Sequence, residues 1–419
     1  MSLGLDAAFA RASEGAAGEA KRPVVAHVLR AYLNPTETFI YKQIASARRY
    51  RPITVAHHYR PNRDLPVIDG TSAAELMSPP WPRLSRLAYR ASRTALPQAC
   101  RAMAERIEQE QSSVLHFHYL VDARFLRGVK RRLNLPAVVS GYGYDVSLFP
   151  RQMWGLGRRY LEPIFSEFDL FLAMSEDMRT DMIGLGCPEE RIRVHFYGVD
   201  SERFQAPDRR YDDEGTLTVL CCGTLQTKKA QHLVLEALAR VEDRGVRDFR
   251  VVLVGDGPMR AELEAWVRRQ RWEDRVLFAG HVPHASDELV EHYRRADVFA
   301  LPSVTVHGDK EGIPTVLVEA MAAGLPVVSS YHAGIPAAIE SGVDGLLVPE
   351  YDVEALADAF ERVLDDAALR RRLGEAAAAT ARTKLDLEAG TRELENIYDE
   401  LLEHAAPAPA RPRRRDGVR

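Results

Sequence analysis

The chain has 419 residues, of which 46% are hydrophobic and 28% are charged, and its formal net charge is −4. This length exceeds one ordinary core and predicts two domains of a globular protein. The weakly acidic balance argues against a nucleic-acid-binding protein, because such proteins usually carry a basic excess. The four cysteines lack metal-ligand spacing, so we expect reduced, buried thiols, no metal site and a cytoplasmic protein.

The two ends of the chain differ in composition from the rest. Residues 1–21 lack the basic start and long apolar core of a signal peptide, and no stretch of the sequence is apolar over a membrane-spanning length. Residues 405–419 are rich in Ala, Pro and Arg. We therefore expect a flexible segment at 1–21 and a disordered tail at 405–419.

Short apolar or β-branched runs alternate with helical stretches through most of the chain, a pattern typical of parallel strands joined by crossover helices. A polar stretch at 205–215 interrupts the alternation and is the predicted linker. The sequence therefore predicts an α/β protein of two Rossmann-like, doubly wound domains, 22–204 and 216–385, with a ligand cleft between them. The predicted strands are 24–28, 53–56, 114–117, 137–140, 170–174, 194–196, 217–222, 251–254, 276–279, 298–301, 327–329 and 346–348.

The stretch at 307–330, HGDKEGIPTVLVEAMAAGLPVVSS, reads as loop, short helix, turn and buried strand. Pro314 suits the first turn of a helix, and Gly324 is placed to end it. The backbone N–H groups at the helix start could hold an anion such as a diphosphate. Glu319 lies among apolar residues and needs donors, which vicinal sugar hydroxyls would supply, and Glu311 precedes it by eight residues. The alternative is a helix whose charged side chains only face water.

Further candidate ligand groups follow other strands of the second domain. Gly223 would let a ligand approach the backbone, and Lys229 beyond it could neutralise a diphosphate, although an isolated lysine more often lies on the surface. Two later segments, 255–258 and 280–283, follow the next two strands, and the first of them has a sufficient structural explanation as a turn.

In the first domain, the segments 116–119 and 141–145 end neighbouring strands and should converge on the cleft, which makes His118 and Tyr142 candidate site residues. Structural histidines are the alternative. The loop 33–36 faces the same side and either caps the next helix or contacts a ligand such as a phosphate. The arginine-rich stretch 81–107 has apolar residues at helical spacing, so it either lies on an anionic membrane with Trp81 at the headgroups or simply faces water.

The pair Glu311 and Glu319, with the glycine and proline between them, resembles the E-x7-E signature of retaining GT-B glycosyltransferases of family 4. The loop at 32–40 is similar to that of exopolysaccharide enzymes of the colanic acid and amylovoran type. The resemblance implies a GT-B fold, in which the terminal helix, 386–404, crosses back onto the first domain. The family has a G-R-L-x-x-x-K-G pattern, and Lys229 matches its lysine. Thr224 takes the place of its arginine, and Ala230 takes the place of its second glycine. One positive charge is therefore missing, so either Lys228 compensates for it, another domain supplies a cation, or turnover is weak.

The resemblance also implies roles for individual residues. Glu311 would orient the donor sugar, Glu319 would hold the ribose and Lys229 the diphosphate. Tyr142 takes the place of a histidine that approaches the donor sugar, and Ala337 that of an acidic residue. The expected site comprises catalytic Glu311, Lys229, His118 and Tyr142, and nucleotide-sugar-binding Gly223, Thr224, Lys229, Gly255, His281, Val282, Gly312, Ile313, Pro314, Thr315 and Glu319.

The implied activity is retaining transfer from a nucleotide sugar, UDP- or GDP-linked, to a glycan, a lipid-linked acceptor or a small molecule. No D-x-D motif occurs in the sequence, which fits a reaction without a metal or another cofactor. We expect a role in cell-surface polysaccharide synthesis by a cytoplasmic protein, with peripheral contact at the inner face of the membrane as a further possibility. The alternatives are natural-product glycosylation, nucleotide-sugar epimerisation and a non-catalytic binding subunit.

Overall fold

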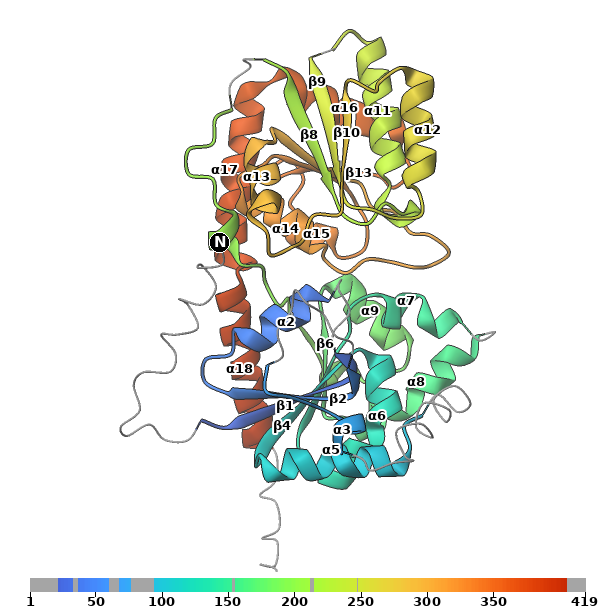
Figure 1. The fold of residues 1–419 in the computed structure, drawn as a ribbon, viewed down its shortest axis with the longest axis vertical. Helices are drawn as coiled ribbons and strands as arrows, with labels where there is room; N and C mark the ends of the chain where they lie inside the picture. Colours follow the sequence, from blue (N-terminus) through green and yellow to red (C-terminus); the bar gives the residue numbers. More distant parts are fainter. Residues whose placement is uncertain are drawn as a thin grey trace, which may run out of the picture.

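The computed structural model describes residues 22–32, 37–59, 68–76, 94–152, 155–211, 215–246 and 248–404. The expectations for 1–21, the loop 33–36, Trp81 and the tail 405–419 lie outside these residues. Figure 1 shows two α/β domains stacked along the long axis of the molecule, joined on one side by the linker and by the column of α17 and α18.

The N-terminal domain is built on a seven-stranded sheet in the order β3-β2-β1-β4-β5-β6-β7. All neighbouring strands in it are parallel, which requires crossover connections between the strands. Its strands are β1 Val24–Tyr32, β2 Arg51–Tyr59, β3 Gly70–Ser72, β4 Ser112–His118, β5 Ala137–Ser140, β6 Leu170–Ala173 and β7 Ile192–Val194. Its helices are α2 Thr38–Ala45, α3 Ala73–Leu76, α5 Pro97–Gln109, α6 Leu120–Leu133, α7 Tyr144–Ser147, α8 Leu156–Glu167, α9 Glu176–Gly184 and α10 Ser201–Phe204.

The C-terminal domain has a six-stranded parallel sheet in the order β10-β9-β8-β11-β12-β13. Its strands are β8 Leu217–Cys222, β9 Phe249–Val254, β10 Val276–Gly280, β11 Val298–Leu301, β12 Val327–Ser330 and β13 Leu346–Val348. Its helices are α11 Gln231–Asp243, α12 Arg260–Gln270, α13 Asp287–Arg295, α14 Thr315–Ala322, α15 Ile335–Ala338, α16 Val353–Asp365 and α17 Ala367–Lys384. Both sheets thus have the doubly wound order in which the chain reverses direction beside the first strand.

Two predicted details of the first sheet need correction. The strand expected at 194–196 is β7, Ile192–Val194, because the chain beyond it turns toward the domain crossing, where Val199 pairs with Leu385 and Leu387. The short strand β3 was not predicted, since its sequence, Gly-Thr-Ser, carries no apolar run.

The last helix, α18 (Leu387–His404), packs on the N-terminal domain. Its buried Glu395 accepts hydrogen bonds from the backbone N–H groups of Arg48, Arg49 and Tyr50 at 2.7–3.2 Å. Three donors on one carboxylate explain why an acidic residue is tolerated in this buried position. The chain therefore crosses between the domains twice, first in the linker and again between α17 and α18.

The described part of the arginine-rich stretch forms α5, whose apolar side chains are buried in the core of the first domain: Ala99, Cys100, Met103, Ala104 and Ile107. That face is therefore not free to enter a membrane. Within the described ranges, no helix is both long enough and apolar enough to cross a bilayer. All four cysteines are buried free thiols, as expected.

Candidate active site

Three strand-end turns of the second domain lie against one another. Gly223, after β8, has φ +144°, and Gly255, after β9, has φ +133°. A Cβ on Gly255 would stand 2.1 Å from the carbonyl oxygen of Gly223, so a side chain cannot be accommodated there. The Gly255 N–H in turn donates to the Gly280 carbonyl at 2.7 Å. The sequence-predicted Gly223, Gly255 and His281 turns are thus brought together at one edge of the sheet.

Beside these turns, two lysines surround the carboxylate of Glu311. Lys229 Nζ lies 3.1 Å from Glu311 Oε1, and Lys228 Nζ lies 3.7 Å from the same atom and 2.9 Å from Asp309 Oδ2. The Lys229, Glu311 and Lys228 side chains are only 12%, 14% and 16% exposed. Burial alone would raise the pKa of Glu311, but the two ammonium groups lower it below its usual value. This lysine–carboxylate cluster therefore holds concentrated charge in a partly dry site.

Two residues outside the predicted site fix the backbone of Glu311. The Glu311 N–H donates to Nε2 of the buried His332 at 3.0 Å, and His332 Nδ1 lies 2.7 Å from Glu350 Oε1. Because Nε2 accepts, the neutral ring carries its proton on Nδ1 and donates it to Glu350. Both residues follow strand ends, β12 and β13, and that position was the sequence signal that could have identified them.

The second glutamate of the motif, Glu319, is 1% exposed and faces the protein interior. His284 Nε2 lies 2.7 Å from its Oε1, and the Tyr293 hydroxyl donates to its Oε2 at 2.9 Å. Burial alone would raise the pKa of Glu319, but the neighbouring His284 lowers it. Each carboxylate oxygen can accept a further hydrogen bond, so contact with ribose stays a prediction. His284 was not predicted.

The α14 helix begins at Thr315, with Pro314 as its N-cap residue. Gly312, Ile313 and Pro314 are buried and Thr315 is half-buried. A Cβ on Gly312 would stand 2.8 Å from Met174 Sδ of the first domain. The helix start therefore lies against the N-terminal domain, with its first-turn N–H groups beside the lysine–carboxylate cluster.

Tyr142 reaches this region from the first domain, whereas His118 does not. The carbonyl of Tyr142 would lie 3.5 Å from a Cβ on Gly312. His118 has no exposed surface; its Nδ1 lies 2.7 Å from the Tyr142 hydroxyl and its Nε2 lies 2.9 Å from His27 Nδ1. His118 is therefore buried beside the Tyr142 hydroxyl, so it would contribute to the site through Tyr142, and a catalytic role for it stays a prediction.

His27, His116 and His118 form a buried histidine cluster whose ligand atoms lie within 4.8 Å of one another. The His116 and His118 rings are stacked with their centroids 4.4 Å apart, the His27 ring is tilted by 37° against His116, and His27 Nδ1 lies 2.9 Å from His118 Nε2. His116 is also held by Tyr398 at 2.6 Å and Ser140 at 2.7 Å. We therefore describe the cluster as a hydrogen-bonded core and not as a metal centre.

The positions that depart from the family pattern have distinct surroundings. Thr224 is exposed, and its carbonyl accepts from Gln231 Nε2 at 3.1 Å. Ala230 has φ +55°, the conformation that a glycine adopts most easily. His281 is exposed and Val282 is buried. At Ala230 the chain thus has a backbone conformation suited to the glycine of the family pattern although the residue type has changed.

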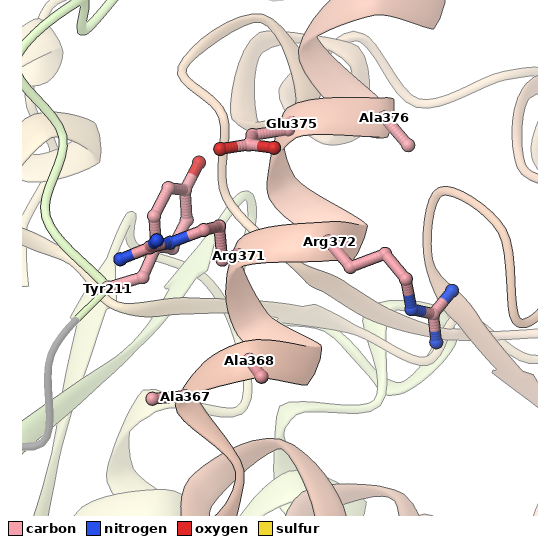
Figure 2. A pocket seen from close by; sticks show the side chains of 7 residues that line it. All are labelled: Tyr211, Ala367, Ala368, Arg371, Arg372, Glu375 and Ala376. Atoms are coloured by element: carbon pink, nitrogen blue, oxygen red, sulfur yellow. The ribbon is translucent and has the colours of Figure 1, made fainter.

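A separate cavity of about 600 Å³ lies along α17 beside the linker residue Tyr211. Figure 2 shows Arg371, Arg372 and Glu375 along α17, with Tyr211 beside the Arg371 side chain. None of the residues that line it belongs to the lysine–carboxylate cluster or to the strand-end turns. The candidate site is therefore the charged region around Glu311 and not this cavity.

The two parallel-sheet, Rossmann-like domains match solved GT-B glycosyltransferase structures. The structure of Anabaena Alr3699/HepE in complex with UDP aligns with a TM-score of 0.72 over 90% of this chain and 100% of that chain, at 18% identity. Because the identity is low, this likeness shows the fold alone.

Sequence comparison identifies the family. Residues 45–203 match the model described as Glycosyltransferase Family 4, and residues 203–380 match Glycosyl transferases group 1. The amylovoran biosynthesis glycosyltransferase AmsK of Erwinia amylovora is 35% identical over 290 residues, 69% of this chain and 70% of that protein. An Escherichia coli K12 protein named as a colanic acid biosynthesis glycosyltransferase, WcaL, is 40% identical over 217 residues, or 52% of each chain. The match thus spans about half the length of that relative. The chain belongs to the family 4, group 1 glycosyltransferases.

Proposed function

We propose that this protein transfers a sugar from a nucleotide sugar to a glycan or lipid-linked acceptor in the synthesis of a cell-surface polysaccharide. The observation that carries the proposal is the lysine–carboxylate cluster, in which Lys229 and Lys228 flank Glu311 at the start of α14. Fixed cations and helix N–H groups in a partly dry site are suited to a diphosphate. The similarity to AmsK and WcaL supports the polysaccharide context.

The reaction would be leaving-group-assisted transfer with retention. The bond between the sugar C1 and the diphosphate oxygen breaks, and a bond from C1 to the acceptor oxygen forms on the same face. The acceptor proton passes to the leaving phosphate oxygen. Lys229, Lys228 and the N–H groups of the residues 312–315 would stabilise the charge on the departing diphosphate.

The remaining predicted residues would bind the donor. Glu311 would accept from hydroxyls of the donor sugar, and Glu319 from the ribose. Gly223, Thr224 and Gly255 would border the diphosphate, and the chain at His281 and Val282 would contact the base. Tyr142 would close the sugar site from the first domain, with His118 behind it.

In this proposal the lysines serve the purpose of a divalent cation. Transfer should therefore continue after dialysis against EDTA and should not rise when Mg²⁺ or Mn²⁺ is added. An absolute requirement for either ion would refute this part of the proposal.

The test is a thermal-shift screen with UDP-, GDP-, ADP- and dTDP-sugars, followed by a transfer assay with the donor that stabilises the protein. Formation of a glycosylated product with the donor's anomeric configuration is the expected result. Release of free sugar or an epimer without any acceptor would instead indicate a hydrolase or epimerase. The departures at Thr224 and Ala230 favour a second candidate, a binding subunit, which would bind nucleotide but not turn over with any acceptor.

A further inference from the structure

Lys310, the residue before Glu311, reaches across the cleft to helix α9 of the first domain. Its Nζ lies 3.0 and 3.1 Å from the two carboxylate oxygens of Asp177 and 2.7 Å from Asp181 Oδ2. The two aspartates are four residues apart on α9, which places them on one helix face. One ammonium group of the second domain is thus held by two carboxylates of the first.

The three successive charges of this loop are divided between the two domains. Asp309 pairs with Lys228, and Glu311 pairs with Lys229, both within the second domain. Lys310 alone of the three points the other way and pairs with Asp177 and Asp181. The loop is therefore held between its own domain and the opposite one.

The backbone of the same loop also contacts the first domain. The Lys310 N–H donates to Ser147 Oγ at 3.1 Å. Gly143, with φ +123°, lies so near that a Cβ on it would stand 3.1 Å from the Lys310 carbonyl oxygen and 3.4 Å from the Gly312 nitrogen. In Figure 1, α7 and α9 lie on the edge of the first domain that faces the second, away from the α17–α18 column. These contacts can exist only when the domains are closed on that side.

We propose that Lys310, Asp177 and Asp181 form an interdomain clamp that fixes the Glu311 loop when the domains close. Lys310 is a positioning residue: it does not touch the reacting atoms but couples closure to the placement of Glu311. This inference rests on the proposed function for its catalytic consequence, whereas the clamp itself is a statement about domain position. Since the side chains are 23%, 39% and 32% exposed, salt will weaken the clamp.

The experiment compares Lys310→Ala and the double variant Asp177→Asn/Asp181→Asn with Lys310→Arg, which keeps the charge. Arg179→Ala is the matched control, because Arg179 lies on the same helix but pairs with Glu189 inside the first domain at 2.6 Å. Spin labels at Arg158→Cys on α8 and Arg269→Cys on α12 report the interdomain distance, since both positions are exposed and the native cysteines are buried. The measurements are this distance by pulsed EPR, UDP and GDP binding by calorimetry, and kcat and KM for transfer.

The clamp predicts longer label distances in Lys310→Ala and in the aspartate double variant, and wild-type distances in Lys310→Arg and Arg179→Ala. It also predicts unchanged nucleotide affinity and a fall in kcat of at least ~10-fold, because a misplaced group loses catalytic efficiency steeply. Wild-type protein in 1 M NaCl should resemble Lys310→Ala. Unchanged distances in both cleft variants would overturn the clamp. If the wild-type protein transferred no sugar, the proposed function would be wrong. The interdomain label distances would still show whether the clamp exists.

Discussion

His332 holds the backbone of Glu311: its Nε2 accepts the Glu311 N–H at 3.0 Å, while its Nδ1 lies 2.7 Å from Glu350. The glutamate that we propose to contact the donor sugar is therefore held by a residue 21 positions later in the chain. Lys229 holds the side chain of Glu311, and Lys310 holds the loop from across the cleft. The three contacts together determine where the carboxylate can act.

Replacement of His332 by alanine should weaken both stability and transfer. It leaves a buried N–H without its acceptor, which costs about 1–3 kcal/mol in the free energy of unfolding. Transfer should fall mainly through kcat, because Glu311 loses its orientation. Urea unfolding and steady-state kinetics measure the two effects.

Glu350→Gln is the matched comparison, because the amide oxygen can still accept from His332 Nδ1. We expect it to retain most of the stability and turnover that His332→Ala loses. Full activity in a stably folded His332→Ala protein would show that this contact does not position Glu311.

Lys228 should replace the missing arginine at Thr224. We expect Lys228→Ala to reduce kcat/KM by about 10- to 100-fold, since it removes one charge-assisted contact to the diphosphate. Adding Thr224→Arg to that variant should restore much of the loss, because the family places its cation there. Kinetics of the two single variants and the double variant measure this coupling, and a double variant no better than Lys228→Ala would contradict it.

Gly312→Ala should hold the domains apart at the start of α14. The new Cβ would stand 2.8 Å from Met174 Sδ, nearer than atoms in contact can approach. Transfer should therefore fall while nucleotide binding to the second domain persists. Shortening the opposing side chain in Gly312→Ala/Met174→Ala should recover activity, and failure to recover it would place the effect within the α14 backbone.

The histidine cluster should make stability depend on pH. Burial lowers the pKa of His27 from 6.5 to about 3, so the folded protein keeps this ring neutral while the unfolded chain takes up a proton below pH 6.5. The contribution of His27 is therefore complete above pH 6.5 and is lost progressively as the pH falls toward 3. The slope is about 1.4 kcal/mol per pH unit. Burial raises the pKa values of Asp122 and Asp145 to about 6. These groups therefore take up protons in the folded protein between pH 6 and 4, which stabilises it and opposes the loss due to His27.

A variant isolates the contribution of His27 from these opposing groups. Urea unfolding at pH 7.5 and 5.5 should show that His27→Gln loses less stability over this interval than the wild type, by about 1 kcal/mol. An equal pH dependence in His27→Gln and wild type would contradict the assignment.

Local sequence patterns predicted most of the fold, because strands such as 137–140 and 217–222 are apolar runs bounded by turns. The same patterns predicted that Lys229, Glu311 and the strand-end glycines lie close together, because the carboxyl ends of parallel strands share one edge of the sheet. They could not predict that His118 is buried against His27, because this contact joins two strands that are distant in the sequence. They also could not predict the contact between Lys310 and Asp177, because it depends on the relative position of the two domains.

The most direct test of the account is the rate of transfer by Lys229→Ala and Glu311→Ala with the donor that the thermal-shift screen identifies. Circular dichroism and the melting temperature confirm that each variant is folded. We predict a loss of at least ~100-fold in kcat/KM for each, because both groups act on charge or orientation in the transition state. Transfer at the wild-type rate by either folded variant would contradict the assignment of the lysine–carboxylate cluster as the active site.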